Sequence, residues 1–294
     1  MSTPPPENNH PANRDSSGIG RDGHRPGPDE GPTGDGRGGW VDGAWLALGT
    51  LTVLPARMPS RVDRVVGGRA MVVAPLVGMV VGGISAGVVA VAQALRPDAE
   101  LLAAVLGVLV VVVVSGALHL DGLADFADAL GSRRARETML RIMKQSDIGP
   151  FGVVAIVMVL LLDVAALTAC IQAGFGWQAA LIAVTASRLT LPWTCRTTIP
   201  SARPGGLGAM VAATVRPIAA VVATVVVLAG ALALAGFDGA RLAGSAGAVL
   251  LAVVVSILVA RRARRALGGV TGDVLGATVE LALPVTLLTL ALTA

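Results

Sequence analysis

Apolar stretches long enough to cross a lipid bilayer recur along this chain and limit the folds that it can adopt. A helix needs about 20 consecutive apolar residues to span the hydrocarbon core of a bilayer. Runs close to this length lie at 70–95, 101–118, 149–173, 179–199, 214–236, 243–260 and 274–293. We therefore predict an all-α fold, a polytopic integral membrane helical bundle with about seven transmembrane helices.

The composition agrees with this class and excludes an ordinary soluble domain. Of the 294 residues, 54% are hydrophobic and 14% are charged, and the mean hydropathy is +0.73. The net charge of +4 comes from basic residues that are dispersed over several loops without interleaved aromatic side chains, so no nucleic-acid partner is expected. The two cysteines lie inside apolar runs, so neither a disulfide framework nor a cysteine metal site is expected. The expected surroundings are membrane lipid.

The ends of the apolar region suggest two domains. Residues 1–39 are rich in proline and charge and contain no apolar run, so we predict a disordered cytoplasmic tail followed by a membrane-embedded domain at 40–294. The stretch from Gly43 to Pro55 is too short to cross, and we predict an interfacial or re-entrant helix there, with a tilted eighth span as the alternative.

The first full span contains glycines that are spaced four residues apart. Gly78, Gly82, Gly83 and Gly87 form two overlapping pairs of small residues with this spacing. Such pairs are typical of close helix packing, which we predict here.

The basic residues predict the orientation, because cytoplasmic loops of membrane proteins are enriched in Lys and Arg. One set of loops carries Arg57, Arg61, Arg64, Arg69, Arg133, Arg134, Arg136, Arg141, Lys144, Arg203, Arg261, Arg262, Arg264 and Arg265. The opposite set carries only Arg96 and Arg241. The first set is therefore predicted to be cytoplasmic, with the protein in the inner membrane and its candidate chemistry on the cytoplasmic face.

Three aspartates follow the second apolar run directly. Asp121, Asp125 and Asp128 are spaced i, i+4 and i+7, so a helix would present all three on one face. Because like charges repel, we expect a bound cation to neutralise this face. Carboxylates are hard oxygen ligands, which favour Mg²⁺ or Mn²⁺. Helix capping is the alternative, but it fits Asp121 better than the other two. We predict that the three are catalytic and hold one or two Mg²⁺ ions against a diphosphate.

A second acidic pair lies at the start of the last apolar run. Asp273 and Glu280 are seven residues apart and share a helical face. Glu280 lies about two turns into the span, where an ionisable group is costly and tends to be functional. We predict that both are metal or substrate ligands. The alternatives are a helix cap at Asp273 and an interhelical hydrogen bond at Glu280.

Several ordered motifs in this chain resemble those of the cobalamin synthase family, the adenosylcobinamide-GDP ribazoletransferases. The motifs are GALHLDGLADFAD at 116–128, IMKQSDIG at 142–149, ASR at 186–188, GLG at 206–208 and GGVTGDVLGATVE at 268–280. The resemblance runs from about residue 44 to the C-terminus. Its two acidic motifs are specific, whereas its glycine-rich pieces are not.

The resemblance implies an Mg²⁺-dependent enzyme that transfers the cobinamide phosphate group of adenosylcobinamide-GDP to α-ribazole or its 5′-phosphate and releases GMP. It is compatible with a homo-oligomer or with association with other corrinoid-pathway enzymes. The residues expected to contact substrate are His119, Lys144, Ser146, Arg188, Gly206, Gly208 and Thr271. A membrane anchor is the alternative for Lys144, and an interfacial position is the alternative for His119.

The chain departs from the family pattern at two places. Gln145 follows Lys144 where the family usually has an acid, which moves the acid to Asp147. Asp163 lies midway along its span where the family often has Lys, and we predict that it pairs with Arg188 or is protonated.

Two other functions remain as alternatives. A phosphotransferase for CDP-activated alcohols would also carry paired aspartates, but its pattern requires an arginine and a further acidic pair that the segment around Asp121 lacks. A solute or cation transporter could use Asp163, Arg188 and Glu280 as pathway groups, but it leaves the three aspartates of the first motif without a role.

Overall fold

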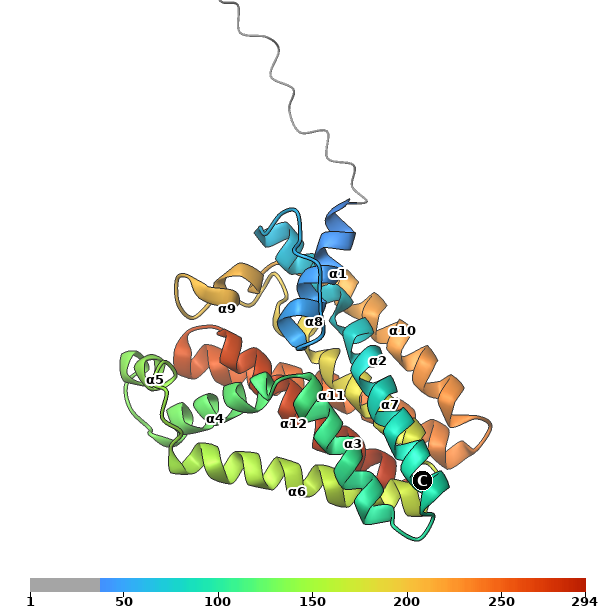
Figure 1. Ribbon diagram of the computed structural model, residues 1–294. Coiled ribbons are helices and arrows are strands. Elements are labelled where there is room, and N and C mark those ends of the chain that lie inside the picture. Colours follow the sequence, from blue (N-terminus) through green and yellow to red (C-terminus); the bar gives the residue numbers. More distant parts are fainter. Residues whose placement is uncertain (1–37) are drawn as a thin grey trace, which may run out of the picture. The chain divides into compact units, whose positions relative to one another are not determined.

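The computed structural model describes residues 38–294, and within this part of the chain helices are joined by short connections (Figure 1). The helices of the described residues are α1 (Gly38–Leu51), α2 (Arg64–Leu95), α3 (Glu100–Val114), α4 (Leu118–Gly131), α5 (Arg136–Ile142), α6 (Pro150–Gln172), α7 (Gly176–Arg188), α8 (Thr190–Thr194), α9 (Gly206–Val211), α10 (Pro217–Ala235), α11 (Gly239–Leu267) and α12 (Gly272–Ala291). The predicted tail at 1–39 lies outside the described residues, apart from its last two positions, which begin α1.

Five of these helices are long and apolar enough to cross a membrane. They are α2, α6, α10, α11 and α12, and the pair α3 and α4 makes a sixth candidate that is bent by 86°. The predicted class, a multi-pass helical membrane protein, is confirmed. The predicted count of about seven is not reached by length, because the run at 179–199 is divided between α7 and α8, which have 13 and 5 residues.

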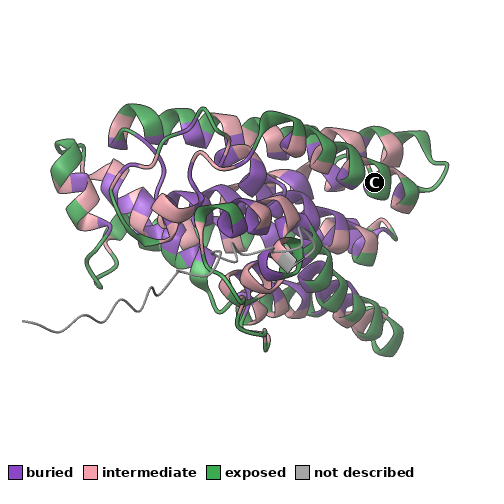
Figure 2. Cartoon of the chain, turned by 90° about the horizontal axis from the view of Figure 1, so that it is seen from above, coloured by how far each residue is buried: buried purple, intermediate pink, exposed green. Residues whose placement is uncertain are grey.

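The outer helices present apolar side chains outward. In α10 only 22% of the spanning window is buried inside the protein, and in α6 33%, whereas the value for α12 is 72%. Figure 2 shows the buried residues gathered in the middle of the bundle and exposed residues along its outer side. The exposed face of α10 carries Val221, Val222, Val225 and Val226. Contiguous apolar surface of this kind is unfavourable in water and is covered by lipid tails in a bilayer. The helix α12 therefore lies inside the bundle, while α6 and α10 face lipid.

The four glycines of α2 that form the predicted small-residue pairs differ in their surroundings. A Cβ on Gly78 would lie 3.0 Å from the Thr185 backbone, and one on Gly82 would lie 3.1 Å from Val184, so both meet α7 closely. At Gly83 and Gly87 no atom of another described helix lies within 4 Å of such a Cβ. The predicted close packing is confirmed for the first pair and wrong for the second.

The two acidic motifs meet where α4 crosses α12. A Cβ on Gly122 would lie 2.8 Å from the Asp273 carbonyl oxygen, and one on Gly276 would lie 3.1 Å from the His119 backbone. Glycine at both positions lets the two backbones approach more closely than side chains would allow. The turn before α4 has positive φ at Gly116 (60°) and Ala117 (56°), and it directs α4 across α12 instead of continuing α3.

The helix α1 corresponds to the predicted short helix at 43–55, although it begins and ends earlier. It packs against α2 and is too short to be a span. Ser60, in the segment before α2, donates to Asp42 from its hydroxyl group (2.5 Å) and from its amide (2.9 Å). These hydrogen bonds, the hydroxyl first, hold the pKa of Asp42 below its usual value.

Replacing Gly122 with Ala tests the close crossing of α4 and α12. The new methyl group would collide with the Asp273 backbone, so we expect a loss of about 2 kcal/mol in stability, in the range measured for overpacked sites. Thermal unfolding in detergent measures the change. Gly83→Ala is the matched control, because its methyl group meets open space, and it should not lower the unfolding temperature. Equal behaviour of the two variants would contradict the crossing.

Candidate active site

A cavity of about 240 Å³ lies where α4, α12 and the segment before α9 meet. Its polar lining includes acidic side chains from two helices and one arginine from the segment between them. The residues that line the cavity include Leu118, His119, Asp121, Ser201, Arg203, Gly205, Gly206, Gly208, Thr271, Gly272, Asp273 and Gly276.

A short backbone pairing fixes one wall of the cavity. Ser201 and Val270 form an isolated parallel bridge. The Ala202 amide donates to the Val270 carbonyl and the Val270 amide donates to the Pro200 carbonyl, each at 2.9 Å. A Cβ on Gly269 would lie 2.4 Å from the Pro200 oxygen, so the pairing requires glycine there. As a result Arg203 stands beside the first turn of α12.

Arg203 pairs with Asp273 across the cavity wall. The distance from Arg203 Nη2 to Asp273 Oδ2 is 3.1 Å, and the Thr271 hydroxyl group donates to the same oxygen at 3.1 Å. Thr271 also caps α12 by accepting from the Val274 amide at 3.3 Å. Thr271, and not Asp273, is therefore the N-cap residue of α12. The Asp273 carboxylate faces the cavity instead.

Sequence reasoning missed Arg203 as a site residue. In the sequence it belongs only to the basic loop residues that predict the orientation of the protein. The available signal was its place directly before Pro204, Gly205 and Gly206, in a connection between two apolar runs. The sequence alone does not predict the backbone bridge between Ser201 and Val270. This bridge brings the segment that carries Arg203 next to α12.

Asp121 is the acidic residue of α4 that lines the cavity, and Asp125 lies one turn further along this helix, outside the lining. Asp121 is exposed at the cavity, and Asp125 is half-buried and within reach of the charges of Asp121, Asp128 and Asp273, with Arg203 opposing them. Among the described residues no group of three or more Asp, Glu, His or Cys side chains is arranged to hold a metal ion. Mg²⁺ usually takes only one or two carboxylates, together with waters and substrate phosphates, and Asp121 and Asp273 offer that donor set.

The carboxylate of Asp128 is engaged elsewhere. The Gly149 amide donates to its Oδ2 at 2.7 Å, and the Gly152 amide donates to its Oδ1 at 3.0 Å. A Cβ on either glycine would collide with this carboxylate. Asp128 is buried, does not line the cavity and ties α4 to the start of α6. Its predicted role as a metal ligand is not supported by this geometry.

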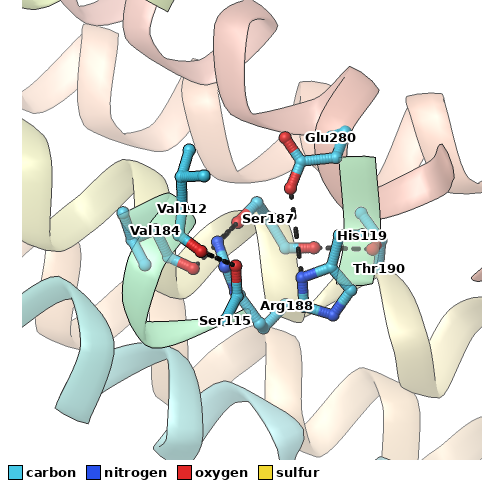
Figure 3. A network of polar contacts seen from close by, with 8 residues as sticks. All are labelled: Val112, Ser115, His119, Val184, Ser187, Arg188, Thr190 and Glu280. Carbon is cyan, nitrogen blue, oxygen red and sulfur yellow. Dashed lines mark hydrogen bonds and ion pairs between the residues drawn. The ribbon is translucent and has the colours of Figure 1, made fainter. Parts of the chain in front are cut away.

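Glu280 is likewise turned away from the cavity. Its carboxylate is buried, and Oε1 lies 3.9 Å from Nδ1 of His119, which does line the cavity (Figure 3). Neither ring nitrogen of His119 has a hydrogen-bond partner among the described residues. The distance of 3.9 Å is too long for the predicted interhelical hydrogen bond, so Glu280 lies close to His119 across two helices without bonding to it, and it lies outside the cavity that its predicted metal role requires.

Arg188 and Asp163 are buried beside this pair, with exposed fractions of 1% and 0%. Arg188 donates from Nη1 to the Ser187 hydroxyl oxygen at 2.8 Å, as Figure 3 shows. Arg188 and Asp163 are close enough to influence each other's charge, but no ion pair within 4.0 Å joins the two side chains. The predicted direct pairing is therefore absent, and neither Asp163 oxygen has a hydrogen-bond partner in the described part of the chain.

The remaining predicted substrate contacts divide between the cavity and its surroundings. Gly206, Gly208 and Thr271 line the cavity, and a Cβ on Gly208 would lie 2.7 Å from the Thr271 backbone. Lys144 and Ser146 are exposed in the segment after α5 and are not part of the lining.

Fold and site together define a class: a multi-pass helical membrane protein whose cavity joins carboxylates from two helices to one arginine. Residues 43–291 match the family described as cobalamin-5-phosphate synthase. The chain belongs to this family.

Proteins named adenosylcobinamide-GDP ribazoletransferase are similar to this chain over most of its length. The relative from Frankia casuarinae is 42% identical over 267 residues, which cover 85% of this chain and 94% of the relative. Those from a Nocardioides species and from Pseudomonas aeruginosa are each 41% identical, covering 83% and 84% of this chain and 96% of each relative. No solved structure matches the chain.

Replacing Asp128 with Asn separates a structural role from a metal role. An amide retains only one acceptor oxygen, so one of the amides of Gly149 and Gly152 loses its partner, at a cost of about 2 kcal/mol. Thermal unfolding in detergent should detect the loss, whereas Asp121→Asn should unfold as the wild type does. If Asp128→Asn leaves stability unchanged but abolishes Mn²⁺ binding, the metal role is restored.

Proposed function

We propose that this protein is an adenosylcobinamide-GDP ribazoletransferase. It transfers the cobinamide phosphate group of adenosylcobinamide-GDP to a ribose hydroxyl group of α-ribazole or of its 5′-phosphate, and it releases GMP. The new oxygen–phosphorus bond forms at the phosphorus that carries the cobinamide. The bond that breaks joins this phosphorus to the oxygen that bridges the diphosphate; this oxygen leaves as part of GMP, and the hydroxyl proton passes to solvent.

One observation carries this proposal beyond family membership. Asp121 of α4 and Asp273 of α12 line one cavity together with Arg203 and the glycine-rich start of α9. Phosphoryl transfer to a hydroxyl group depends on positioning the diphosphate and neutralising its charge. Carboxylates for a divalent cation, an arginine and unhindered backbone amides are the groups that this task requires.

We propose Mg²⁺ as the cofactor, with Asp121 and Asp273 as ligands and Asp125 close behind them. When bound, Mg²⁺ would neutralise charge on the diphosphate oxygens as the bridging bond breaks. Asp121 is fixed in the first turn of α4, and Asp273 is held by Thr271 in the first turn of α12. Gly206 places no side chain in the cavity, and Gly208 lets the start of α9 pack against the Thr271 backbone, so that a phosphate can approach the backbone at Gly206.

The proposed location of this site is the cytoplasmic face of the inner membrane. The cavity lies at the ends of the spans that carry the dense basic loops, including Arg203 itself. A nucleotide-activated substrate would reach it from that side without crossing the bilayer.

The two other candidate functions have less support. The family match runs through both acidic motifs and does not concern CDP-activated alcohols or transport. Asp163, Arg188 and Glu280, the proposed pathway groups of a transporter, do not line the cavity.

A turnover assay with purified protein in detergent or nanodiscs tests the proposal. GMP should be released only when adenosylcobinamide-GDP, α-ribazole and Mg²⁺ are all present. Asp121→Asn and Asp273→Asn should each lower the rate at least about 100-fold, the size expected when one electrostatic stabiliser is removed.

Glu137→Gln is the control for this assay, because Glu137 is exposed in α5 and lies outside the cavity. This variant should keep the wild-type rate. Release of GMP without α-ribazole would indicate a hydrolase, and a wild-type rate in Asp121→Asn would remove this residue from the reaction.

A further inference from the structure

Arg203 has a partner among the described residues for only one of the two terminal nitrogens of its guanidinium group. Its Nη2 contacts Asp273, but its Nη1 is buried and has no hydrogen-bond partner among the described residues. A buried donor without a partner is costly, and it marks a position where a partner is expected. Arg203 is also the one Arg or Lys among the described residues that line the cavity.

The position of this guanidinium group is set by the backbone around it. The bridge between Ser201 and Val270 holds the segment, and Arg136 donates to the Ala202 carbonyl at 2.8 Å from the other side. The side chain is 24% exposed and that of Asp273 is 22% exposed, so the pair is partly shielded from water yet open to the cavity. A ligand that enters the cavity therefore meets both members of the pair.

The two members suit two different ligands. A planar guanidinium group with parallel N–H donors matches two oxygens of a phosphate, whereas a carboxylate oxygen suits a hard divalent cation. While Arg203 neutralises Asp273, each lowers the affinity of the other for its own ligand. A metal ion on Asp273 frees the guanidinium group, and a diphosphate on Arg203 frees the carboxylate.

We propose that Arg203 binds the diphosphate of the nucleotide-activated substrate and, through its exchange with Asp273, couples nucleotide binding to divalent-cation binding. This inference rests on the proposed function and adds a substrate-binding residue together with a reason why metal and nucleotide bind cooperatively. Coupling of this kind is reciprocal, so each ligand must raise the affinity for the other by the same factor.

Two binding measurements on the full chain in nanodiscs test this inference without turnover. One is the affinity for GDP by calorimetry, with and without Mg²⁺, and the other is the affinity for Mn²⁺ by electron paramagnetic resonance in the absence of nucleotide. Arg203→Ala should weaken GDP binding about tenfold to a hundredfold, the range of a charge-assisted hydrogen bond. The same variant should tighten Mn²⁺ binding about fivefold or more, because Asp273 loses its competing cation.

Opposite shifts are the signature that a purely structural role cannot produce. If Arg203→Ala weakens both ligands in parallel, or leaves GDP binding unchanged, the inference is overturned. Arg203→Lys keeps the charge without the planar fork and covers the case in which the alanine variant does not fold. It should keep wild-type Mn²⁺ affinity and lose part of the GDP affinity.

Arg216→Ala is the matched control, since Arg216 is an exposed arginine at the start of α10 and does not line the cavity. Both affinities should equal those of the wild type. GMP release from both substrates, combined with GDP binding that does not depend on Arg203, would reject this inference and leave the proposed function intact. Absence of GMP release with opposite binding shifts would reject the transferase and keep a coupled metal and nucleotide site.

Discussion

The glycine contacts between α4 and α12 are the constraint on which the site depends. Each helix contributes acidic side chains that would repel one another, and only a close backbone approach brings them to one cavity. Gly122 lies against Asp273, and Gly276 lies against His119, so each glycine faces a residue of the other acidic motif. The glycines that permit the helix crossing are therefore part of the same two motifs that supply the acidic side chains.

The membrane class and the location of the acidic motifs could be predicted from the sequence, because both depend on local patterns. Apolar runs identified the spanning helices α2, α6, α10, α11 and α12, and the i, i+4, i+7 spacing placed three aspartates on one helix. The run at 179–199 misled the count, since an apolar segment surrounded by other helices has the same composition as one surrounded by lipid.

The roles within the site could not be predicted, because they depend on contacts between distant segments. Nothing in the spacing of Asp128 reveals that Gly149 and Gly152 satisfy its carboxylate from 21 and 24 residues away. Arg203 is separated from Asp273 by 70 residues. Their pairing depends on the backbone bridge between Ser201 and Val270, which no local sequence pattern predicts. The buried group of His119, Arg188 and Glu280 likewise joins three helices.

The size of the cavity limits how much of a large molecule the protein can surround. Its volume of about 240 Å³ lies below the roughly 300 to 1,000 Å³ typical of pockets that enclose a drug-sized ligand. A corrinoid is far larger, so under the proposed function its macrocycle stays outside and only the pyrophosphate joint enters. The protein would then recognise its substrate by the pyrophosphate and the groups next to it, and chemical differences at the distant upper face of the corrin ring would not affect binding.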